Sequence, residues 1–438
     1  MIAELLGTSN KAALTVHELE LPSYRYVDVF KSVEHFVSKL DKVRKIETTH
    51  TEDLNTIIHG KQDQWQSRKI TKASQTPWPT SASEAVFLPL DCFWICPSPE
   101  GEKRFVIRVR FVQYMQKVKL ELACGDKSGG EAAANEIATH SVQNSIYRNR
   151  VIHLSYESGK KDEYGDVEKA ETLQVLFSSI ETVDEKNIIL SDDQVDLIRR
   201  NILDLRLKKD VLLNNGVPTH RGVLFHGPPG TGKSFACRYI CHVLKDTTCI
   251  FATGSVLTQV GALFSLARLL QPAILFIEDA DLMFSSRESN MYSTTLGDLM
   301  DQMDGLRAQE NISVVLTTND IARLEGALKD RPGRISQCIY MGAPDADLRL
   351  RYIQHQLREY DLSDIDLDLL VTESEGTTQA FIKEWLHRSV QIACERLDQA
   401  SQKAVLGNGD FVVALKEMQQ SLDTAGHKIV GFTAPKRG

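Results

Sequence analysis

The feature that most constrains this chain is a glycine-rich stretch near its middle. Residues 227–234 read GPPGTGKS, which fits the phosphate-loop pattern G-x-x-x-x-G-K-[ST]. Glycines let the backbone curl closely around a polyphosphate, so that successive N–H groups and the N-terminus of the next helix face the anion. The apolar run 222–225 predicts a buried strand before the loop, and the periodicity of 235–244 predicts a helix after it. The sequence therefore predicts a strand–loop–helix unit that binds a nucleoside polyphosphate.

Each residue of this loop has an expected part in binding. Lys233 is expected to reach the β- and γ-phosphates, and the Ser234 hydroxyl is expected to ligate Mg²⁺. A chance Gly/Pro turn is the alternative, and the strand and helix patterns on either side argue against it. The expected cofactors are ATP and Mg²⁺. The other loop positions expected to contact the nucleotide are Gly227, Pro228, Pro229, Gly230, Thr231 and Gly232.

The size and charge of the chain limit its class. It has 438 residues, enough for two or three domains of roughly 100–200 residues each. The formal net charge of -8 disfavours general binding to nucleic acid by charge, although it leaves room for a local basic stripe. We find neither an apolar run of roughly 18–20 residues, which spanning a bilayer requires, nor a secretory signal pattern at the N-terminus. A cytoplasmic protein without a membrane segment is expected.

The eight cysteines are scattered and do not suggest a disulfide framework. Cys92 and Cys96 have a loose metal-like spacing, but no second Cys/His pair follows nearby, so no zinc site is expected. Cys237 and Cys241 lie one helical turn apart behind the phosphate loop, and they are expected to be small core residues.

The stretch that follows the phosphate loop alternates between strand and helix patterns. Short apolar strands alternating with helices predict a parallel sheet covered on both faces, with ligands bound at the carboxyl ends of the strands. Helical patterns dominate from 344 onwards. The expected fold class is an α/β P-loop NTPase sheet with a small helical lid. The expected strands are 222–225, 249–253, 273–277, 312–317 and 337–341, and the expected lid helices are 346–360, 379–393 and 409–423.

The N-terminal region carries no catalytic motif, and its patterns predict an α+β domain. Helical periodicity runs from 24 to 46, and a second helix is expected over 129–144. Arg108 and Arg110 share one face of a predicted strand. We expect a half-buried sheet with solvated arginines there, and a binding stripe is the alternative. The expected strands are 85–90, 93–96, 105–112, 118–123, 151–156 and 173–177.

Acidic and amide side chains follow two of the predicted nucleotide-domain strands. Glu278, Asp279 and Asp281 come directly after the strand 273–277, and Asn319 ends the strand that begins at 312. One carboxylate at such a strand end can hold Mg²⁺ through water, and a second can orient and polarise the attacking water. The Asn319 amide can hold that water in line with the γ-phosphate. The alternative reading of the acids is an ordinary acidic turn.

Two arginines follow further along the chain, in the sequence RPGR. Arg331 and Arg334 would be surface residues in isolation. In this context they can act as arginine fingers, which neutralise charge on the transferring phosphate. With the usual sheet order they cannot easily reach the nucleotide of their own subunit. They would then enter a neighbour's site, and the active unit would be a ring.

The order of these parts resembles the AAA family of ring ATPases, within the wider AAA+ class, over residues of about 185–435. The matching motifs are GPPGTGKS, the acidic strand ILFIEDAD, Asp304-Gly305, TTND around Asn319, and LEGALKDRPGR. The resemblance implies a homo-oligomeric ring, commonly a hexamer, with Arg331 and Arg334 as the fingers. It also implies that Phe235 packs near the adenine and that Gly216 borders the base. The expected domains are 1–185, 186–343 and 344–438.

The sequence departs from the family at the acidic pair. The usual Asp-Glu order is inverted to Glu278-Asp279. If roles carry over by position, Glu278 is the acid on the metal side and Asp279 polarises the water. A shorter Asp would then have to lie closer to that water. A mitochondrial inner-membrane AAA protein that exports the folded Rieske iron–sulfur subunit has a similar inversion, so the inverted order is compatible with activity, and slow hydrolysis is a reasonable expectation.

Two further departures bear on function. Members that thread their substrates carry an aromatic-hydrophobic-Gly loop after the second strand, whereas residues 253–261 here form a short stretch with no aromatic residue. Without an aromatic residue to hold an extended chain, this segment argues against an unfoldase that threads its substrate. In the lid, residues 377–380 read TTQA where the wider class often has an Arg. Members of the narrower AAA family also lack that Arg.

These patterns favour an ATP-hydrolysing ring that remodels or translocates a protein client. The N-terminal α+β region is expected to recruit that client or an adaptor. The inverted acids and the missing pore aromatic leave a nucleotide-gated assembly scaffold with slow turnover as the alternative. A nucleic-acid motor is disfavoured by the charge and by the lack of a recognisable helix-turn-helix or zinc element.

Overall fold

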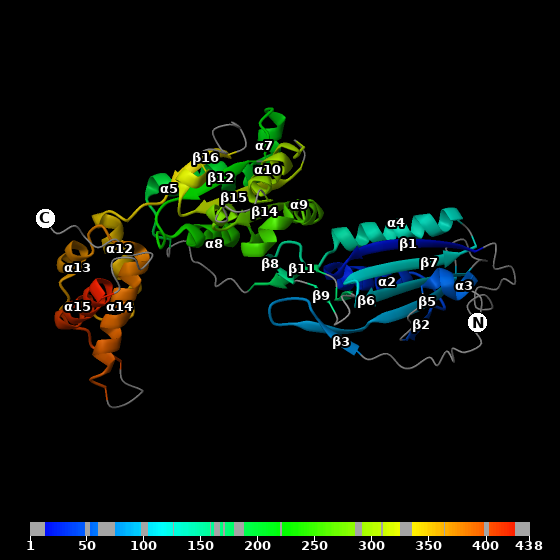
Figure 1. Cartoon of the computed structure of the whole chain (residues 1–438), viewed down its shortest axis with the longest axis horizontal. Coiled ribbons are helices and arrows are strands. Elements are labelled where there is room, and N and C mark those ends of the chain that lie inside the picture. The colour runs from blue at the N-terminus through cyan, green and yellow to red at the C-terminus, as the bar shows by residue number, and fades with distance from the viewer. Residues whose placement is uncertain are drawn as a thin grey trace. The chain divides into compact units, whose positions relative to one another are not determined.

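The chain forms two compact units, Met1–Ser179 and Ile180–Gly438, and each is described by itself. Figure 1 shows the elements of the computed structural model in chain order. The structure describes residues 14–48, 53–59, 75–97, 104–125, 127–157, 159–161, 167–169, 171–178, 188–219, 221–284, 291–307, 310–324, 335–362, 364–397 and 403–424.

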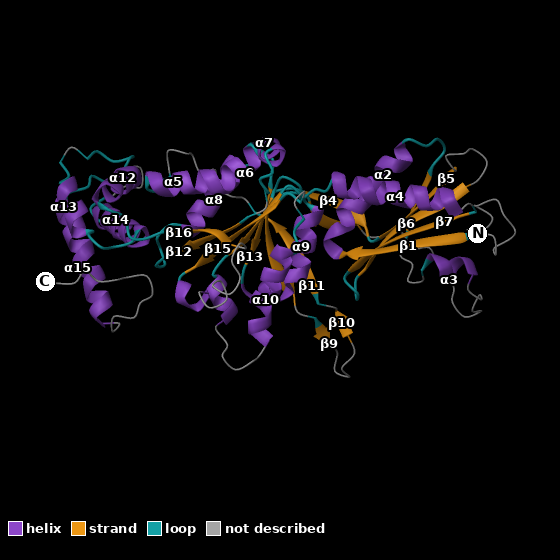
Figure 2. Ribbon diagram, turned by 90° about the horizontal axis from the view of Figure 1, so that it is seen from above, coloured by secondary structure: helices purple, strands orange, loops and turns teal. Residues whose placement is uncertain are grey.

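The first unit is built on an antiparallel five-stranded sheet. Helices α2 (Tyr26–Ser38) and α4 (Lys127–Gln143) cover one face, and the short α3 (Leu54–His59) covers the other (Figure 2). Two clusters of buried apolar side chains, one on each face, form the core. In spatial order the strands are β1 (Thr15–Pro22), β7 (Lys117–Cys124), β6 (Arg104–Val112), β5 (Asp91–Pro97) and β2 (Arg44–Glu47).

Shorter elements complete this unit. A 3₁₀ turn (Ser23–Arg25) leads into α2, and an antiparallel hairpin is made by β3 (Gln75–Pro79) and β4 (Ala85–Pro89). Two further antiparallel pairs follow α4. They are β8 (Val151–Glu157) with β11 (Thr172–Phe177), and β9 (Lys160–Lys161) with β10 (Val167–Lys169).

The helix predicted over 24–46 is too long. It ends at Ser38, the chain turns through Lys42 with a left-handed φ of 59°, and Arg44–Glu47 is strand β2. The apolar periodicity continued past the end of the helix, but pairing of β2 with β5 decides the conformation there.

The expectation of solvated arginines is wrong. The Arg108 side chain is fully buried, and Arg110 is buried as well. Arg108 donates to both carboxylate oxygens of Asp91, at 2.8 and 2.7 Å, and to Glu121 at 3.3 Å. Helix α3 covers this face of the sheet, and the Leu54 N–H at its start donates to Glu121 at 2.5 Å. The strand alternation was correct, but the covering helix was not predicted.

The second unit contains the predicted parallel sheet. Strands β13 (Thr248–Ala252), β14 (Ala273–Ile277), β15 (Ile312–Thr318), β12 (Gly222–His226) and β16 (Ile335–Tyr340) lie side by side in that order, and each neighbouring pair is parallel. Helices lie on both sides of this sheet (Figure 2), which is why β13, β14 and β15 are buried along their whole length.

Helical segments connect these strands and precede them. The chain enters through α5 (Asp192–Ile198), a π-helical turn (Arg199–Leu203), α6 (Asp204–Leu207) and α7 (Lys209–Asn214). Helix α8 (Lys233–Val243) follows β12. The later connections contain 3₁₀ turns at Gly254–Gln259 and Ala280–Phe284, and helices α9 (Val260–Leu269) and α10 (Met291–Asp304).

The C-terminal part of this unit is helical, as predicted. It comprises α12 (Ala346–Gln356), α13 (Leu367–Glu373), α14 (Gln379–Cys394) and α15 (Asn408–Thr424). These helices share their own apolar cluster, which includes the buried Trp385 and Phe411. Helix α13 had no counterpart among the predicted helices. Across the described part of the chain, none of the helices is both long and apolar enough to cross a bilayer.

Candidate functional site

The phosphate loop connects the end of β12 to the start of α8. Three of its glycines, Gly227, Gly230 and Gly232, have positive φ angles of 151°, 79° and 91°. The constraint is tightest at Gly227, where a Cβ atom would lie 1.9 Å from the backbone oxygen of Met341. Residues with a side chain cannot follow this path without strain. The loop therefore requires glycine for its shape, and no side chain caps the N-terminus of α8 that follows it.

The Lys233 side chain folds back over the loop. Its ammonium donates to the backbone oxygens of Gly227 and Pro228, both at 2.8 Å, and the residue is 7% exposed. Burial lowers the pKa of Lys233, and the negative charges of Asp279 and Asp281 oppose that shift. The loop thus holds a buried cation near Asp279 and Asp281, at the ends of β14 and β15.

The predicted acidic and amide residues meet at the ends of β14 and β15. The side-chain amide of Asn319 donates to Oδ1 of Asp279 at 3.0 Å. Asp279 has a left-handed φ of 50°, and its N–H donates to the Thr317 hydroxyl at 3.1 Å. The backbone N–H of the preceding residue, Glu278, donates to the backbone oxygen of Ala252 at 3.2 Å. The structure therefore brings Asp279 and Asn319 into direct contact.

Asp281 has a different environment from the other two acids. It is 8% exposed, and one carboxylate oxygen accepts from the Thr318 hydroxyl at 2.8 Å and from the Asn319 N–H at 3.2 Å. These bonds hold the backbone of Asn319 at the strand end. Thr317 and Thr318 were not among the predicted site residues. The only signal for them was their position before Asn319 in the sequence TTND.

The lid meets the loop at Gly230. The Ala380 N–H, at the start of α14, donates to the Gly230 oxygen at 3.1 Å. A Cβ on Gly230 would lie 2.7 Å from the Ala380 Cβ and 3.1 Å from the Thr378 hydroxyl oxygen. Thr378 itself caps α14 through the Phe381 N–H at 3.4 Å. The residues TTQA therefore contact the phosphate loop directly.

The other predicted site residues are placed as follows. Ser234 is exposed in the first turn of α8, and Phe235 is half-buried. Thr231 donates its hydroxyl to the Pro228 oxygen at 2.8 Å. Gly216 lies in the turn after α7, with a positive φ of 72° and open space beside its Cα. Arg331 and Arg334 lie outside the described residues.

Residues 223–343 contain the phosphate loop, the strand-end acids and Asn319, and this range matches a known family. It fits the family model described as "ATPase family associated with various cellular activities (AAA)". This chain contains an AAA ATPase domain. This domain contains the parallel sheet, the phosphate loop and the acids at the strand ends. The motifs in the sequence predicted all three.

Similar proteins include regulatory subunits of the proteasome. The chain is 31% identical over 255 residues to the 26S proteasome regulatory subunit 8 homolog of Encephalitozoon cuniculi, covering 52% of this chain and 64% of that protein. It is 33% identical over 204 residues to the homolog in Schizosaccharomyces pombe, covering 42% and 50%. It is 27% identical over 271 residues to the ATP-dependent zinc metalloprotease FtsH 2 of Thermoanaerobacter, covering 56% and 52%. The chain thus spans between half and two thirds of the length of these relatives.

Proposed function

We propose that the AAA domain binds Mg-ATP and hydrolyses it with Asp279 as the group that polarises the attacking water. The observation that carries this proposal is the contact between Asn319 and Asp279 beside the buried Lys233. A carboxylate that accepts from an amide at the open end of a sheet is placed to accept a proton from water. The same amide can hold that water, which is the part expected of Asn319.

The loop residues fit a nucleotide polyphosphate. Glycines that take positive φ angles, and a helix that begins at Lys233, place backbone N–H groups toward an anion. The Lys233 ammonium would exchange its two loop carbonyls for phosphate oxygens when the nucleotide enters. The favourable charge pairing would offset the lost hydrogen bonds.

Ser234 and Glu278 are the residues that would hold Mg²⁺. The Ser234 hydroxyl is exposed in the first turn of α8, next to the loop. Within the described residues, no group of three or more His, Cys, Asp or Glu side chains could hold a metal ion. Most ligands of the cation would therefore come from phosphate oxygens and water. When bound, Mg²⁺ supplies neutralisation of the charge that develops on the transferring phosphate.

Arg331 and Arg334 are proposed to complete the site of a neighbouring copy in a homo-oligomeric ring, for which a hexamer is the expected size. Such a site requires two chains, so the rate per chain should rise with protein concentration. Mixtures test this directly. Subunits carrying Arg331→Ala should recover activity when mixed with subunits carrying Asp279→Asn, because one interface then has an intact acid and an intact finger. A lack of recovery at every mixing ratio would contradict the shared site.

A protein client is proposed for the ring, with the first unit, Met1–Ser179, as the part that recruits it. Relatives of this chain are named as proteasome regulatory subunits and an ATP-dependent protease. Residues 254–259 form a 3₁₀ turn that leads directly into α9 and contains no aromatic side chain. This supports remodelling of a client over pulling it as an extended chain.

The affinity of the Lys233→Ala variant for nucleotide tests whether the phosphate loop binds ATP. A fluorescent ATP analogue should bind the unaltered chain and lose at least about 100-fold in affinity with Lys233→Ala, because charge-assisted bonds to phosphate are lost. Lys245→Ala is the matched control, because Lys245 is exposed two residues past the end of the same helix. Equal affinity of the two variants would refute the role of the loop. Binding and ring assembly without turnover would favour the scaffold function.

A further inference from the structure

The first residue of the lid helix α14, Gln379, lies between two residues that contact the phosphate loop. The Ala380 N–H donates to the Gly230 oxygen at 3.1 Å. A Cβ on Gly230 would lie 3.1 Å from the hydroxyl oxygen of Thr378. The backbone of Gln379 is therefore held beside the loop from both sides.

The side chain of Gln379 carries a polar atom without a partner. Its Oε1 atom is buried and accepts no hydrogen bond from the described residues. The two hydroxyls before it, in contrast, are both used. The Thr377 hydroxyl donates to the Ser374 oxygen at 2.7 Å, and the Thr378 hydroxyl accepts from the next turn of α14 at 3.4 Å. A buried acceptor without a donor is unfavourable, so Oε1 lacks a group that a ligand can supply.

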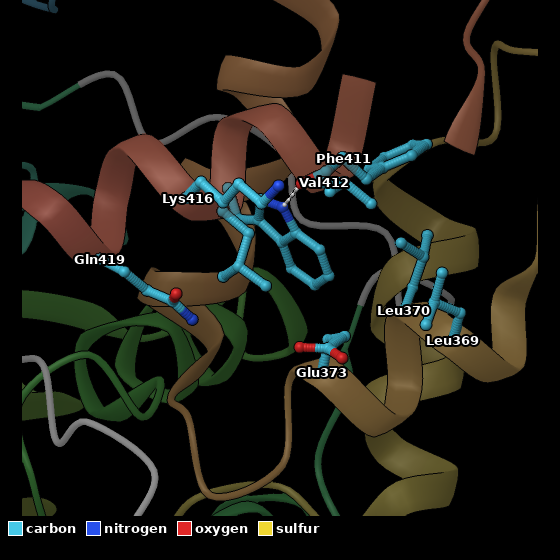
Figure 3. A pocket seen from close by; sticks show the side chains of 9 residues that line it. Leu369, Leu370, Glu373, Phe411, Val412, Lys416 and Gln419 are labelled. Carbon is cyan, nitrogen blue, oxygen red and sulfur yellow. Dashed lines mark hydrogen bonds between the residues drawn. The ribbon is translucent and has the colours of Figure 1, made fainter. Parts of the chain in front are cut away.

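Helix α14 fixes the backbone from which this side chain extends. Phe381, Ile382 and Trp385 are buried in the apolar cluster of the lid. The indole N–H of Trp385 donates to the Phe411 backbone oxygen at 2.8 Å, and Figure 3 shows side chains of α13 and α15 in this part of the lid. Gln379 as a whole is only half-buried. Rotation about its side-chain torsions can therefore bring Oε1 to a donor that enters from solvent.

The chemistry of a carboxamide oxygen limits what the missing partner can be. Such an oxygen only accepts hydrogen bonds, so the partner must be a donor. Phosphate oxygens are acceptors, and the loop already offers them donors through its N–H groups and the Lys233 ammonium. The donors of ATP are at its other end, in the exocyclic amine of adenine and the hydroxyls of the ribose. Gln379 is therefore suited to the nucleoside and not to the phosphates.

The position of the proposed hydrolysis site favours the same end of the nucleotide. Asp279 and Asn319 follow β14 and β15, where we propose that water attacks the γ-phosphate. A triphosphate with its γ-phosphate there extends its nucleoside away from the strand ends. The lid is a second segment in contact with the loop, through Gly230. Among the described segments, the lid is therefore well placed to contact the base.

We propose that Gln379 is a specificity-determining residue of the nucleotide site, and that its Oε1 accepts a hydrogen bond from the exocyclic amine of adenine. This role rests on the proposed function, because it requires the phosphate loop to bind ATP. Asn and Gln amides commonly pair with adenine through this amine. Guanine and hypoxanthine carry an oxygen at the same position, which would face Oε1 with a second acceptor. The chain then selects ATP over these nucleotides, because they leave the buried acceptor unsatisfied.

Competition against a fluorescent ATP analogue tests this role in the full chain. The competitors are ATP and purine riboside triphosphate, which has hydrogen in place of the exocyclic amine. The unaltered chain should bind ATP at least about fivefold more tightly than purine riboside triphosphate. Gln379→Leu should reduce that ratio to below about twofold, because the acceptor is gone. Both nucleotides have the same phosphates, so general damage to the loop or the lid changes both affinities alike.

Gln391→Leu is the matched control, because Gln391 is exposed near the other end of α14. This variant should keep the full ratio between the two affinities. Equal affinity of the unaltered chain for ATP and purine riboside triphosphate would overturn the proposal. An unchanged ratio in Gln379→Leu, or an equal loss of the ratio in Gln391→Leu, would overturn it as well.

Two deoxynucleotides separate the base from the ribose. The loss of affinity of 2′-deoxy-ATP and 3′-deoxy-ATP relative to ATP should be the same in the unaltered chain and in Gln379→Leu. If Gln379→Leu instead removes the discrimination against one of them, Oε1 accepts from a ribose hydroxyl and the assignment to adenine is wrong. Failure of every nucleotide to bind the unaltered chain would refute the phosphate-loop function itself, and this result differs from the others because all competitors fail together.

Discussion

The side-chain amide of Asn319 donates to Oδ1 of Asp279 across 3.0 Å, and this contact joins the residues that follow β14 and β15. Asp279 keeps a left-handed backbone with a φ of 50°, which is uncommon for a residue with a side chain and typical of functional sites. The Thr317 hydroxyl accepts a hydrogen bond from the Asp279 N–H, which supports that backbone conformation. The position of the carboxylate is thus set by both strands.

Asn319→Ala should lower ATP turnover about 100-fold, because it removes the donor that holds the water and the Asp279 carboxylate. Binding of ATP should change little, since the phosphate loop is untouched. Steady-state phosphate release and binding of a fluorescent ATP analogue measure the two effects. Ser336→Ala on the exposed side of β16 is the control. A loss of binding as large as the loss of turnover would contradict this role.

Gly227→Ala should destabilise the second unit by at least about 2 kcal/mol, because the new Cβ would lie 1.9 Å from the Met341 oxygen. Gly261→Ala is the matched control, since it lies inside α9 with nothing within 4 Å of a Cβ. That variant should be neutral or slightly more stable. Urea unfolding followed by far-UV circular dichroism compares them. Equal stability of the two variants would show that the loop is not constrained at Gly227.

The first unit should become less stable as the pH rises between about 4 and 6, because of Asp28. Burial raises the pKa of Asp28 from 3.8 to about 6, although the Ile146 N–H, Ser145 and Arg25 oppose the shift. The protonated form therefore stabilises the folded state at low pH, and this contribution is lost as the pH passes 6. About 3 kcal/mol is at stake at 1.36 kcal/mol per pKa unit.

Asp28→Asn should flatten this pH dependence in urea unfolding curves measured from pH 4 to 7. Asp41→Asn, which changes an exposed residue after α2, is the control and should keep the slope. An unchanged slope in Asp28→Asn would contradict the assignment of this dependence to Asp28.

Arg108→Met should cost about 3–5 kcal/mol of stability, because it removes the guanidinium that pairs with the buried carboxylates of Asp91 and Glu121. Lys39→Met removes an exposed partner of Glu136 and should cost under about 1 kcal/mol. Thermal unfolding of both variants decides between a buried network and an ordinary surface pair. Similar losses in the two variants would refute the buried role of Arg108.

The parallel sheet could be predicted because each of its strands is a short apolar run between clear turn or helix signals. Arg108 shows where that reasoning fails. Alternation in β6 correctly predicted two faces, but the face that carries Arg108 is closed by α3, a six-residue helix with no strong periodicity. A charged side chain on a strand cannot reveal by itself whether a later segment covers it.

In the candidate site too, the residue types could be predicted from the sequence but their contacts could not. The motifs predicted Lys233, Asp279 and Asn319 as residue types at strand and helix ends. They could not predict that Asp281 would bind Thr318 and the Asn319 N–H, because these contacts depend on how β14 and β15 are aligned. The contact between Gly230 and Ala380 joins segments 150 residues apart, and nothing in either segment indicates the other.

Turnover of Asp279→Asn, measured together with its affinity for ATP, tests the central claim most directly. The account predicts that this variant binds ATP as well as the unaltered chain and loses turnover at least about 100-fold, because the carboxylate that accepts the proton from water is gone. Glu278→Gln, at the adjacent position, should instead raise the Mg²⁺ concentration needed for half-maximal turnover. Full turnover in Asp279→Asn, with its loss in Glu278→Gln alone, would contradict the assignment of Asp279.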